Sequence, residues 1–147
     1  MLRGANSKHM KNQANTGAVM VVDDITDVHV AVSRVLQRSG YAFRCGSDGE
    51  ECLAHLRNGF RGLILMDIQM PSLDGWETIR KMVAEGLIAG NLICMLTTRP
   101  TPGEAAVGLE EYVFDYMPKP FEASQLLEVA KLASDYLRPP SGPPGAA

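Results

Sequence analysis

The sequence predicts an α/β fold in which a doubly wound, five-stranded parallel sheet is covered by helices on both faces. Short apolar runs of strand length alternate with segments of helical periodicity along the chain. These runs are apolar at consecutive positions, which is typical of strands buried on both faces of a parallel sheet. With 147 residues, of which 46% are hydrophobic, the chain has the size of one domain with one substantial core.

The first strand is expected at residues 18–22, where AVMVV forms a continuous apolar run. In the next segment, apolar side chains recur at the spacing of one helix face. They are Val28, Val32, Val35 and Leu36. Gly40 then marks the end of this helix, because glycine readily adopts the left-handed conformation that follows a helix.

The second strand is expected at residues 41–45, YAFRC. Either Ser47 or Asp48 can cap the helix after it, because a short polar side chain accepts hydrogen bonds from amides of the first turn. This helix carries Leu53 and Leu56 on one face and ends at an Asn-Gly pair.

The third strand is expected at residues 63–66, LILM, and it runs directly into Asp67. Asp74 can cap the helix that follows. The apolar face of that helix is expected to consist of Trp76, Ile79, Met82 and Val83.

The last two strand and helix pairs are less regular. LICML at 92–96 is the fourth expected strand, and a weaker helical pattern covers 103–111, which nearby prolines and a glycine should shorten or loosen. YVFDYM at 112–117 is the fifth strand. The final helix is expected from about Glu122, with an apolar stripe formed by Leu126, Leu127, Ala130 and Leu137.

Five such repeats with right-handed crossovers give a flavodoxin-like (βα)5 three-layer sandwich. We assign residues 18–138 to this domain. Residues 1–17 are polar and aperiodic, which favours a disordered leader or an expression remnant, and residues 139–147 have the composition of a Pro/Gly-rich tail or linker.

Composition excludes several classes of function. The net charge is −3 and Lys and Arg are scattered, so direct nucleic-acid binding has little support. Apolar runs fall well short of the ~20 residues of a membrane span, and the start of the chain does not resemble a signal peptide. Cys45, Cys52 and Cys94 lack zinc-ligand spacing and are expected to be buried thiols. We therefore expect a cytoplasmic protein without a membrane partner.

Polar residues stand where the expected strands end. Asp23 and Asp24 follow the first strand, Asp67 the third, Thr97 the fourth and Lys119 the fifth. The carboxyl ends of parallel strands meet at one edge, where doubly wound folds bind ligands. Carboxylates ~5 Å apart would repel by about 3 kcal/mol per pair at an effective dielectric near 20. A hard cation such as Mg²⁺, together with the lysine, would compensate.

Each of these residues alone has an ordinary structural explanation. An Asp at a strand end more often caps a helix than binds a ligand, and Thr-Thr after a strand usually makes local turn hydrogen bonds. The joint arrangement is far more specific. VVDD at 21–24, LILMDIQMPSLDGW at 63–76, MLTT at 95–98 and DYMPKPF at 115–121 together resemble the receiver domain of two-component response regulators, such as the single-domain chemotaxis regulator.

This resemblance implies that Asp67 is the phosphoacceptor and takes a phosphoryl group from the phosphohistidine of a histidine kinase or phosphotransfer protein. It implies Mg²⁺ as the cofactor. Asp24 and Asp67 would bind Mg²⁺ directly, Gln69 would contribute its backbone carbonyl, and Asp23 would act mostly through water.

The resemblance also indicates which residues would bind the phosphoryl group and respond to it. Lys119 would bind a phosphoryl oxygen, and Pro120 matches a proline that usually follows it through a cis bond. Thr97 matches the switch hydroxyl and Tyr116 the switch aromatic. The expected output is a shifted protein surface, read by a downstream effector protein or domain, and homodimers are compatible with it.

Three alternatives were weighed. A dehalogenase-type phosphotransferase needs a second Asp two residues after the nucleophile, where this chain has Gln69. A flavodoxin-like cofactor binder needs a hydroxyl- and glycine-rich phosphate loop after the first strand. A phosphorylation-independent pseudo-receiver that acts as a docking module remains the main alternative. In the favoured interpretation the domain is not a turnover enzyme, since it catalyses only its own phosphorylation and slow dephosphorylation.

Overall fold

The computed structural model describes residues 17–98 and 106–138 and confirms the α/β fold. Its five strands form one parallel sheet in the order β2-β1-β3-β4-β5. β1 spans the predicted residues, and the other strands start and end within one residue of the prediction. The strands are β1 (Ala18–Val22), β2 (Ala42–Gly46), β3 (Gly62–Asp67), β4 (Asn91–Thr97) and β5 (Val113–Pro118).

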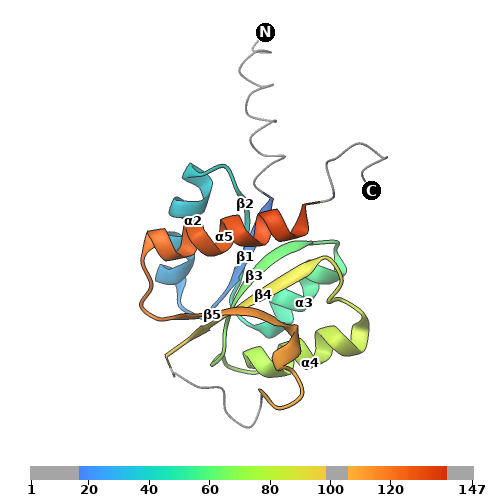
Figure 1. Cartoon of the computed structure of the whole chain (residues 1–147). Helices are drawn as coiled ribbons and strands as arrows, with labels where there is room; N and C mark the ends of the chain where they lie inside the picture. Colours follow the sequence, from blue (N-terminus) through green and yellow to red (C-terminus); the bar gives the residue numbers. More distant parts are fainter. Residues whose placement is uncertain (1–16, 99–105, 139–147) are drawn as a thin grey trace, which may run out of the picture.

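Among the described residues, four α-helices complete three layers. They are α2 (Thr26–Arg38), α3 (Gly49–Arg57), α4 (Gly75–Glu85) and α5 (Ala123–Leu137). As Figure 1 shows, α2 and α5 cover one face of the sheet, and α3 and α4 cover the other. The strand order reverses between β1 and β3, so the crevice at their carboxyl ends is the switch point where doubly wound sheets bind ligands.

The central strands are buried on both faces, as predicted. Successive residues of β3 point to opposite layers, so Ile64 packs with the α3 and α4 side and Leu65 with the α2 and α5 side. Every residue of β3 is buried. This rigid strand delivers Asp67 to the carboxyl edge of the sheet.

The edge strand β2 lies where the sequence predicts it but is less buried than the central strands. Arg44 and Cys45 are exposed because β2 has a neighbouring strand on one side only. The expectation of three buried thiols is therefore wrong for Cys45. It holds for Cys52 and Cys94, where burial raises the pKa of each thiol to about 12.

The helix starts agree with the capping signals. Asp48, rather than Ser47, caps α3 by accepting from the Glu51 amide. Asp74 caps α4 in a reciprocal capping box with Glu77. Val83 was expected on the buried face of α4 but is 37% exposed, since it lies at the margin of the apolar stripe.

The helix predicted over 103–111 lies partly outside the described residues. From Ala106 onward the prediction is wrong, because the chain forms turns and a 3-10 helix, η2 (Glu110–Tyr112). Gly108, with φ of +84°, interrupts any helical path there. Ala106 and Leu109 are nevertheless buried against the α3 and α4 side of the core.

Predictions about residues 1–16 and 139–147 fall outside the described part of the chain. Within 17–98 and 106–138, none of the helices has the length and apolar character needed to cross a bilayer.

Candidate functional site

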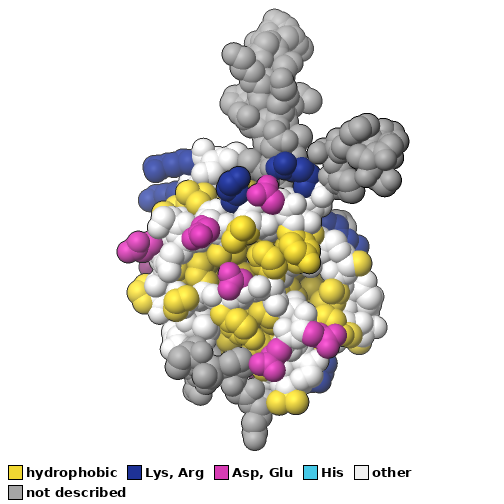
Figure 2. Space-filling view, in the orientation of Figure 1, with side chains coloured by type: hydrophobic (Ala, Val, Ile, Leu, Met, Phe, Trp, Pro, Cys, Tyr) yellow, Lys and Arg dark blue, Asp and Glu magenta, His cyan; other side chains and the backbone are white. Residues whose placement is uncertain are grey.

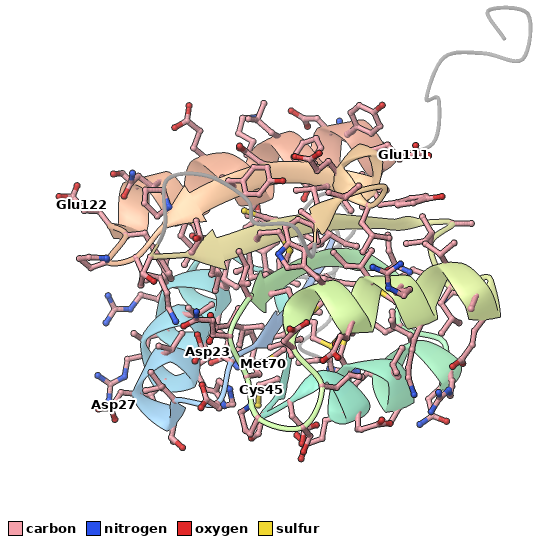
Figure 3. All side chains as sticks on the ribbon, turned by 90° about the horizontal axis from the view of Figure 1, so that it is seen from below. Asp23, Asp27, Cys45, Met70, Glu111 and Glu122 are labelled. Atoms are coloured by element: carbon pink, nitrogen blue, oxygen red, sulfur yellow. The ribbon has the colours of Figure 1, made fainter. Side chains whose placement is uncertain are left out.

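Three acids meet at the carboxyl ends of β1 and β3. Each of Asp23, Asp24 and Asp67 offers a carboxylate oxygen, and these oxygens lie within 4.8 Å of one another. Asp23 is fully buried and Asp67 is 8% exposed, whereas Asp24 is exposed. Figure 3 shows Asp23 inside the molecule, in contrast to Glu111 and Glu122 at its periphery. The acids thus form a cluster with one solvent-facing member.

Asp23 is held from several directions. Its Oδ1 accepts from the Ile25 amide at 2.9 Å and its Oδ2 accepts from Lys119 Nζ at 2.8 Å. The Asp23 amide donates to the carbonyl of Gly46 at 3.1 Å, which ties the end of β1 to the end of β2. His29 Nε2 lies 2.6 Å from the Asp23 carbonyl oxygen. Asp23 is therefore a fixed, buried part of the site.

Lys119 supplies the positive charge between the acids. Its Nζ lies 2.8 Å from Asp23 Oδ2 and 3.6 Å from Asp67 Oδ2. Partial burial acts to lower the pKa of the Lys119 ammonium, but the hydrogen bond to Asp23 and the charge of Asp67 outweigh it, so the pKa is raised. The Lys119 amide donates to the carbonyl of Thr97 at 2.8 Å, and the bond to Pro120 is cis, as the sequence predicted.

Asp67 lies in an environment that disfavours its charge. Burial, and next the negative charge of Asp23, raise the pKa of the Asp67 carboxyl, while Lys119 and the Gln69 amide oppose this rise. The Gln69 amide lies 3.4 Å from Asp67 Oδ1. A carboxylate placed here gains from any further positive charge, which is the property expected of a cation site.

The donor set suits a hard divalent cation. Three carboxylate oxygens close together, with one acid open to solvent, match the preference of Mg²⁺ for a few carboxylates and retained waters. Asp23, Asp24 and Asp67 can therefore hold a metal ion, and such an ion would offset the repulsion that raises the pKa of Asp67.

Comparison with known proteins agrees with this geometry. A family model described as the response regulator receiver domain matches residues 19–131. The chain belongs to the receiver domain family. As in the sequence analysis, the family is one of response regulators of two-component systems.

Curated relatives of this receiver domain are longer proteins. The response regulator MprA of Mycobacterium sp. (strain KMS) is 33% identical over 126 residues, which make up 85% of this chain and 54% of the relative. The response regulator MprA of Mycobacterium avium (strain 104) is 34% identical over 110 residues, covering 74% of this chain and 47% of that protein. The receiver domain thus spans about half the length of the curated relatives it matches.

Two solved structures resemble it over nearly their full length. The CheY-like receiver domain protein of Methanospirillum hungatei JF-1 has a TM-score of 0.80 and 39% identity, covering 84% of this chain and 98% of that one. The chemotaxis protein CheY4 of Vibrio cholerae has a TM-score of 0.72 and 28% identity, with 80% and 98% covered. These similarities support both the fold and the family.

The receiver fold brings most of the predicted site residues together. Asp23, Asp24, Asp67 and Lys119 form one cluster. Thr97 lies on β4 directly after Leu96, the residue that pairs with Asp67 across the sheet. Gln69 is exposed in the loop beyond β3. The roles assigned to these residues remain proposals.

Tyr116 lies apart from the acids, on β5. It pairs with Met95 of β4, and its ring lies beside that of Trp76 in the first turn of α4. Tyr116 is 37% exposed, while Trp76 is 3% exposed. The aromatic pair therefore connects the loop after Asp67 to the surface of β5.

His29 was not among the site residues predicted from the sequence. The spacing in the sequence could have indicated it. A long side chain six positions after Asp23 lies one turn into the helix and can reach back to the end of the strand. A histidine on the margin of an apolar helix face nevertheless has many ordinary explanations. Only the structure shows its contact with the Asp23 carbonyl.

Proposed function

We propose that this receiver domain takes a phosphoryl group onto Asp67 from the phosphohistidine of a histidine kinase or phosphotransfer protein. The observation that carries the proposal is the position of the Asp67 carboxylate, which shares one cluster with Asp23 and Asp24 and has Lys119 Nζ 3.6 Å away. Such a cluster concentrates negative ligands and positive charge where a phosphoryl group would arrive.

In the proposed reaction an Asp67 oxygen attacks phosphorus, an acyl phosphate O–P bond forms, and the P–N bond to the donor imidazole breaks. The imidazole leaves with the electron pair of that bond and takes up a proton. Phosphoryl transfer depends mainly on alignment and on neutralising charge at the equatorial oxygens. Asp67 has to be ionised and aligned, and the Lys119 ammonium meets one of these oxygens.

Mg²⁺ is the proposed cofactor, with Asp24, Asp67 and the Gln69 carbonyl as ligands and Asp23 acting mostly through water. When bound, Mg²⁺ supplies charge neutralisation at the acids and orients the phosphoryl oxygens. Asp23 is already engaged by Lys119 and by the Ile25 amide, which favours a supporting role for it.

After transfer, the new phosphoryl oxygens would accept a hydrogen bond from the Thr97 hydroxyl and draw its loop toward Asp67. Because the Lys119 amide donates to the Thr97 carbonyl, movement of Thr97 would also reach the start of the segment after β5. Tyr116 would change orientation with it. The response is a shift between two populations of one surface, rather than a released product.

That output surface comprises β5 and α5. Figure 2 shows apolar side chains gathered over these elements, and exposed members include Tyr116, Leu132 and Tyr136. Apolar side chains in such numbers mark a contact surface for another protein. We propose a downstream effector protein or domain as its partner, with homodimers as a further use of it.

Further proposals concern the location, the binding partners and the catalytic scope of the domain. We propose a cytoplasmic domain that binds neither membrane nor nucleic acid directly, and that catalyses its own phosphorylation and slow dephosphorylation without turning over a separate substrate. The curated relatives that it matches are named as response regulators. Any activity of a longer protein would depend on its other segments.

The test is to incubate the chain with Mg²⁺ and acetyl phosphate and to measure intact mass. We expect one phosphoryl group, stable in acid and labile in base, that is lost in Asp67→Asn and kept in the matched control Asp115→Asn, which alters an exposed acid on β5. If neither acetyl phosphate nor beryllofluoride forms an adduct, the docking-module alternative takes its place.

A further inference from the structure

The imidazole of His29 contacts the backbone of the acid pair. His29 Nε2 lies 2.6 Å from the carbonyl oxygen of Asp23. A carbonyl oxygen can only accept a hydrogen bond, so the proton of this contact belongs to Nε2. His29 is therefore a donor to Asp23, at a distance slightly below the usual range for an N–H···O hydrogen bond.

This carbonyl belongs to the peptide group that joins Asp23 to Asp24. The two side chains differ in support, because Asp23 is buried and held by Lys119 and by the Ile25 amide, whereas Asp24 is exposed. The direction of the Asp24 side chain depends on the orientation of the peptide group that precedes it. A bond to the carbonyl of that group fixes this orientation.

The position of His29 in α2 explains how its side chain reaches the Asp23 carbonyl. α2 begins at Thr26 after Ile25, whose apolar side chain cannot accept a capping hydrogen bond. Side chains on a helix lean toward its N-terminus, so a long side chain in the second turn can reach the loop before the helix. His29 thus supports the loop that presents both acids.

We propose that His29 is a positioning residue for the metal site and that its Nε2–H bond sets the affinity for Mg²⁺ by holding the Asp23–Asp24 peptide group in place. The proposal rests on the proposed Mg²⁺ site. It predicts that loss of the bond weakens Mg²⁺ binding through Asp24 while the buried Asp23 and the fold stay in place.

The chain offers a matched control. His55 Nε2 lies 3.0 Å from the carbonyl oxygen of Cys45, so it makes the same kind of bond from α3 to a neighbouring strand. Cys45 lies on β2 and is not part of the acid cluster. Loss of the His55 bond should therefore affect stability alone.

The experiment is a titration of the full chain with Mg²⁺, followed by backbone amide chemical shifts, with thermal unfolding measured in parallel. Four variants are compared with the wild type: His29→Leu, His29→Gln, His29→Asn and His55→Leu. The amide nitrogen of Gln reaches about as far as Nε2 of histidine, whereas that of Asn is one bond shorter. Even if His29→Leu does not fold, comparing the Kd values of His29→Gln and His29→Asn shows whether the hydrogen bond affects Mg²⁺ binding.

We expect His29→Leu and His29→Asn to raise the Kd for Mg²⁺ about three- to tenfold, as the loss of one hydrogen bond predicts. His29→Gln and His55→Leu should stay within about twofold of the wild type. Equal Kd values in all variants, with only melting temperatures changed, would make His29 a structural residue and overturn the proposal. If the wild type itself binds no Mg²⁺, the proposed metal site fails and this inference fails with it.

Discussion

The ring of Trp76 lies 6.5 Å from the ring of Tyr116, measured between centroids, with 48° between their planes. Trp76 is the second residue of α4 and follows Gly75, whose amide donates to the Ile68 carbonyl at 2.8 Å. The pair therefore joins the residues that follow Asp67 to the exposed side of β5. This gives Asp67, the proposed phosphoacceptor, a second connection to β5, besides the one through Thr97 and Lys119.

Trp76 is the one tryptophan of the sequence, so its emission reports on this pair without interference. We expect Mg²⁺ with beryllofluoride to change the emission of Trp76, because the proposed movement of Tyr116 alters what lies beside the indole. In Tyr116→Ala the change should be at least halved, whereas Tyr136→Ala, on α5, should keep it. An identical change in Tyr116→Ala would show that Trp76 senses the acid site by another route.

Substituting Asp67 should stabilise the fold at neutral pH. Because the pKa of Asp67 is raised above its ordinary value of 3.8, the folded protein binds this proton more tightly than the unfolded chain does. The ionised carboxylate therefore costs stability above the folded-state pKa, and the cost disappears as the pH falls through that pKa toward 3.8. We expect Asp67→Asn to melt a few degrees higher at neutral pH.

The measurement is thermal unfolding by circular dichroism over a pH series without Mg²⁺. The difference between Asp67→Asn and the wild type should shrink toward acid pH. Asp115→Asn, at an exposed position, should show little difference at any pH. A lower melting temperature for Asp67→Asn at neutral pH would contradict the assigned direction of the pKa shift.

Removing the Lys119 ammonium should affect transfer more than metal binding. Lys119→Gln leaves three carboxylates without their nearby cation, so we expect the Kd for Mg²⁺ to stay the same or fall. Phosphorylation by acetyl phosphate should slow about 100-fold, as for the loss of one transition-state donor. Since Lys119 holds the pKa of Asp67 down, the pH-rate profile should also move to higher pH.

Rates with saturating Mg²⁺ and a separate Mg²⁺ titration distinguish these effects on Lys119→Gln. The matched control is Lys131→Gln, which alters an exposed lysine of α5 that pairs with Asp135. A Lys119→Gln domain that is phosphorylated at the wild-type rate would remove Lys119 from the proposed mechanism.

Gly75 should tolerate no side chain. A Cβ there would lie 2.6 Å from the Asp67 carbonyl oxygen and 3.0 Å from Ile68 Cα, so the backbone that carries Asp67 would have to move. We expect Gly75→Ala to cost about 1–3 kcal/mol of stability, as overpacking does, and to slow phosphorylation of the folded protein.

Gly49→Ala provides the comparison for Gly75→Ala. Its Cβ would meet the Thr78 hydroxyl and Leu73 between α3 and α4, which crowds the core without displacing the Asp67 backbone. Urea unfolding and phosphorylation rates measured together separate the two cases. If both variants lose stability but keep the wild-type rate, the packing of Gly75 on Asp67 has no catalytic importance.

The central fold was predictable because its signals are local. Continuous apolar runs marked β1, β3 and β4, and Asp48 and Asp74 marked helix starts, since each of these features depends on a few neighbouring residues. The acid cluster was also predictable, because the carboxyl ends of parallel strands converge whatever the details of packing.

The features that could not be predicted from the sequence depend on residues that are distant along the chain but close in the fold. The exposure of Cys45 follows from the edge position of β2, which no local pattern states. The same holds for the preference of Lys119 for Asp23 over Asp67, at 2.8 Å against 3.6 Å, and for the reach of His29 to a carbonyl. The failed helix prediction after β4 reflects Gly108, whose positive φ outweighs a weak apolar pattern.

The two ends of the described chain lie together at the opposite edge of the sheet from the acids. Gly17 and Arg138 line one cavity of about 350 Å³ beneath the amino ends of β1 and β3. The polypeptide therefore enters and leaves the described domain on the side away from Asp67. Both points of attachment of the described domain to the rest of the polypeptide thus lie at the edge of the sheet opposite the proposed phosphorylation site.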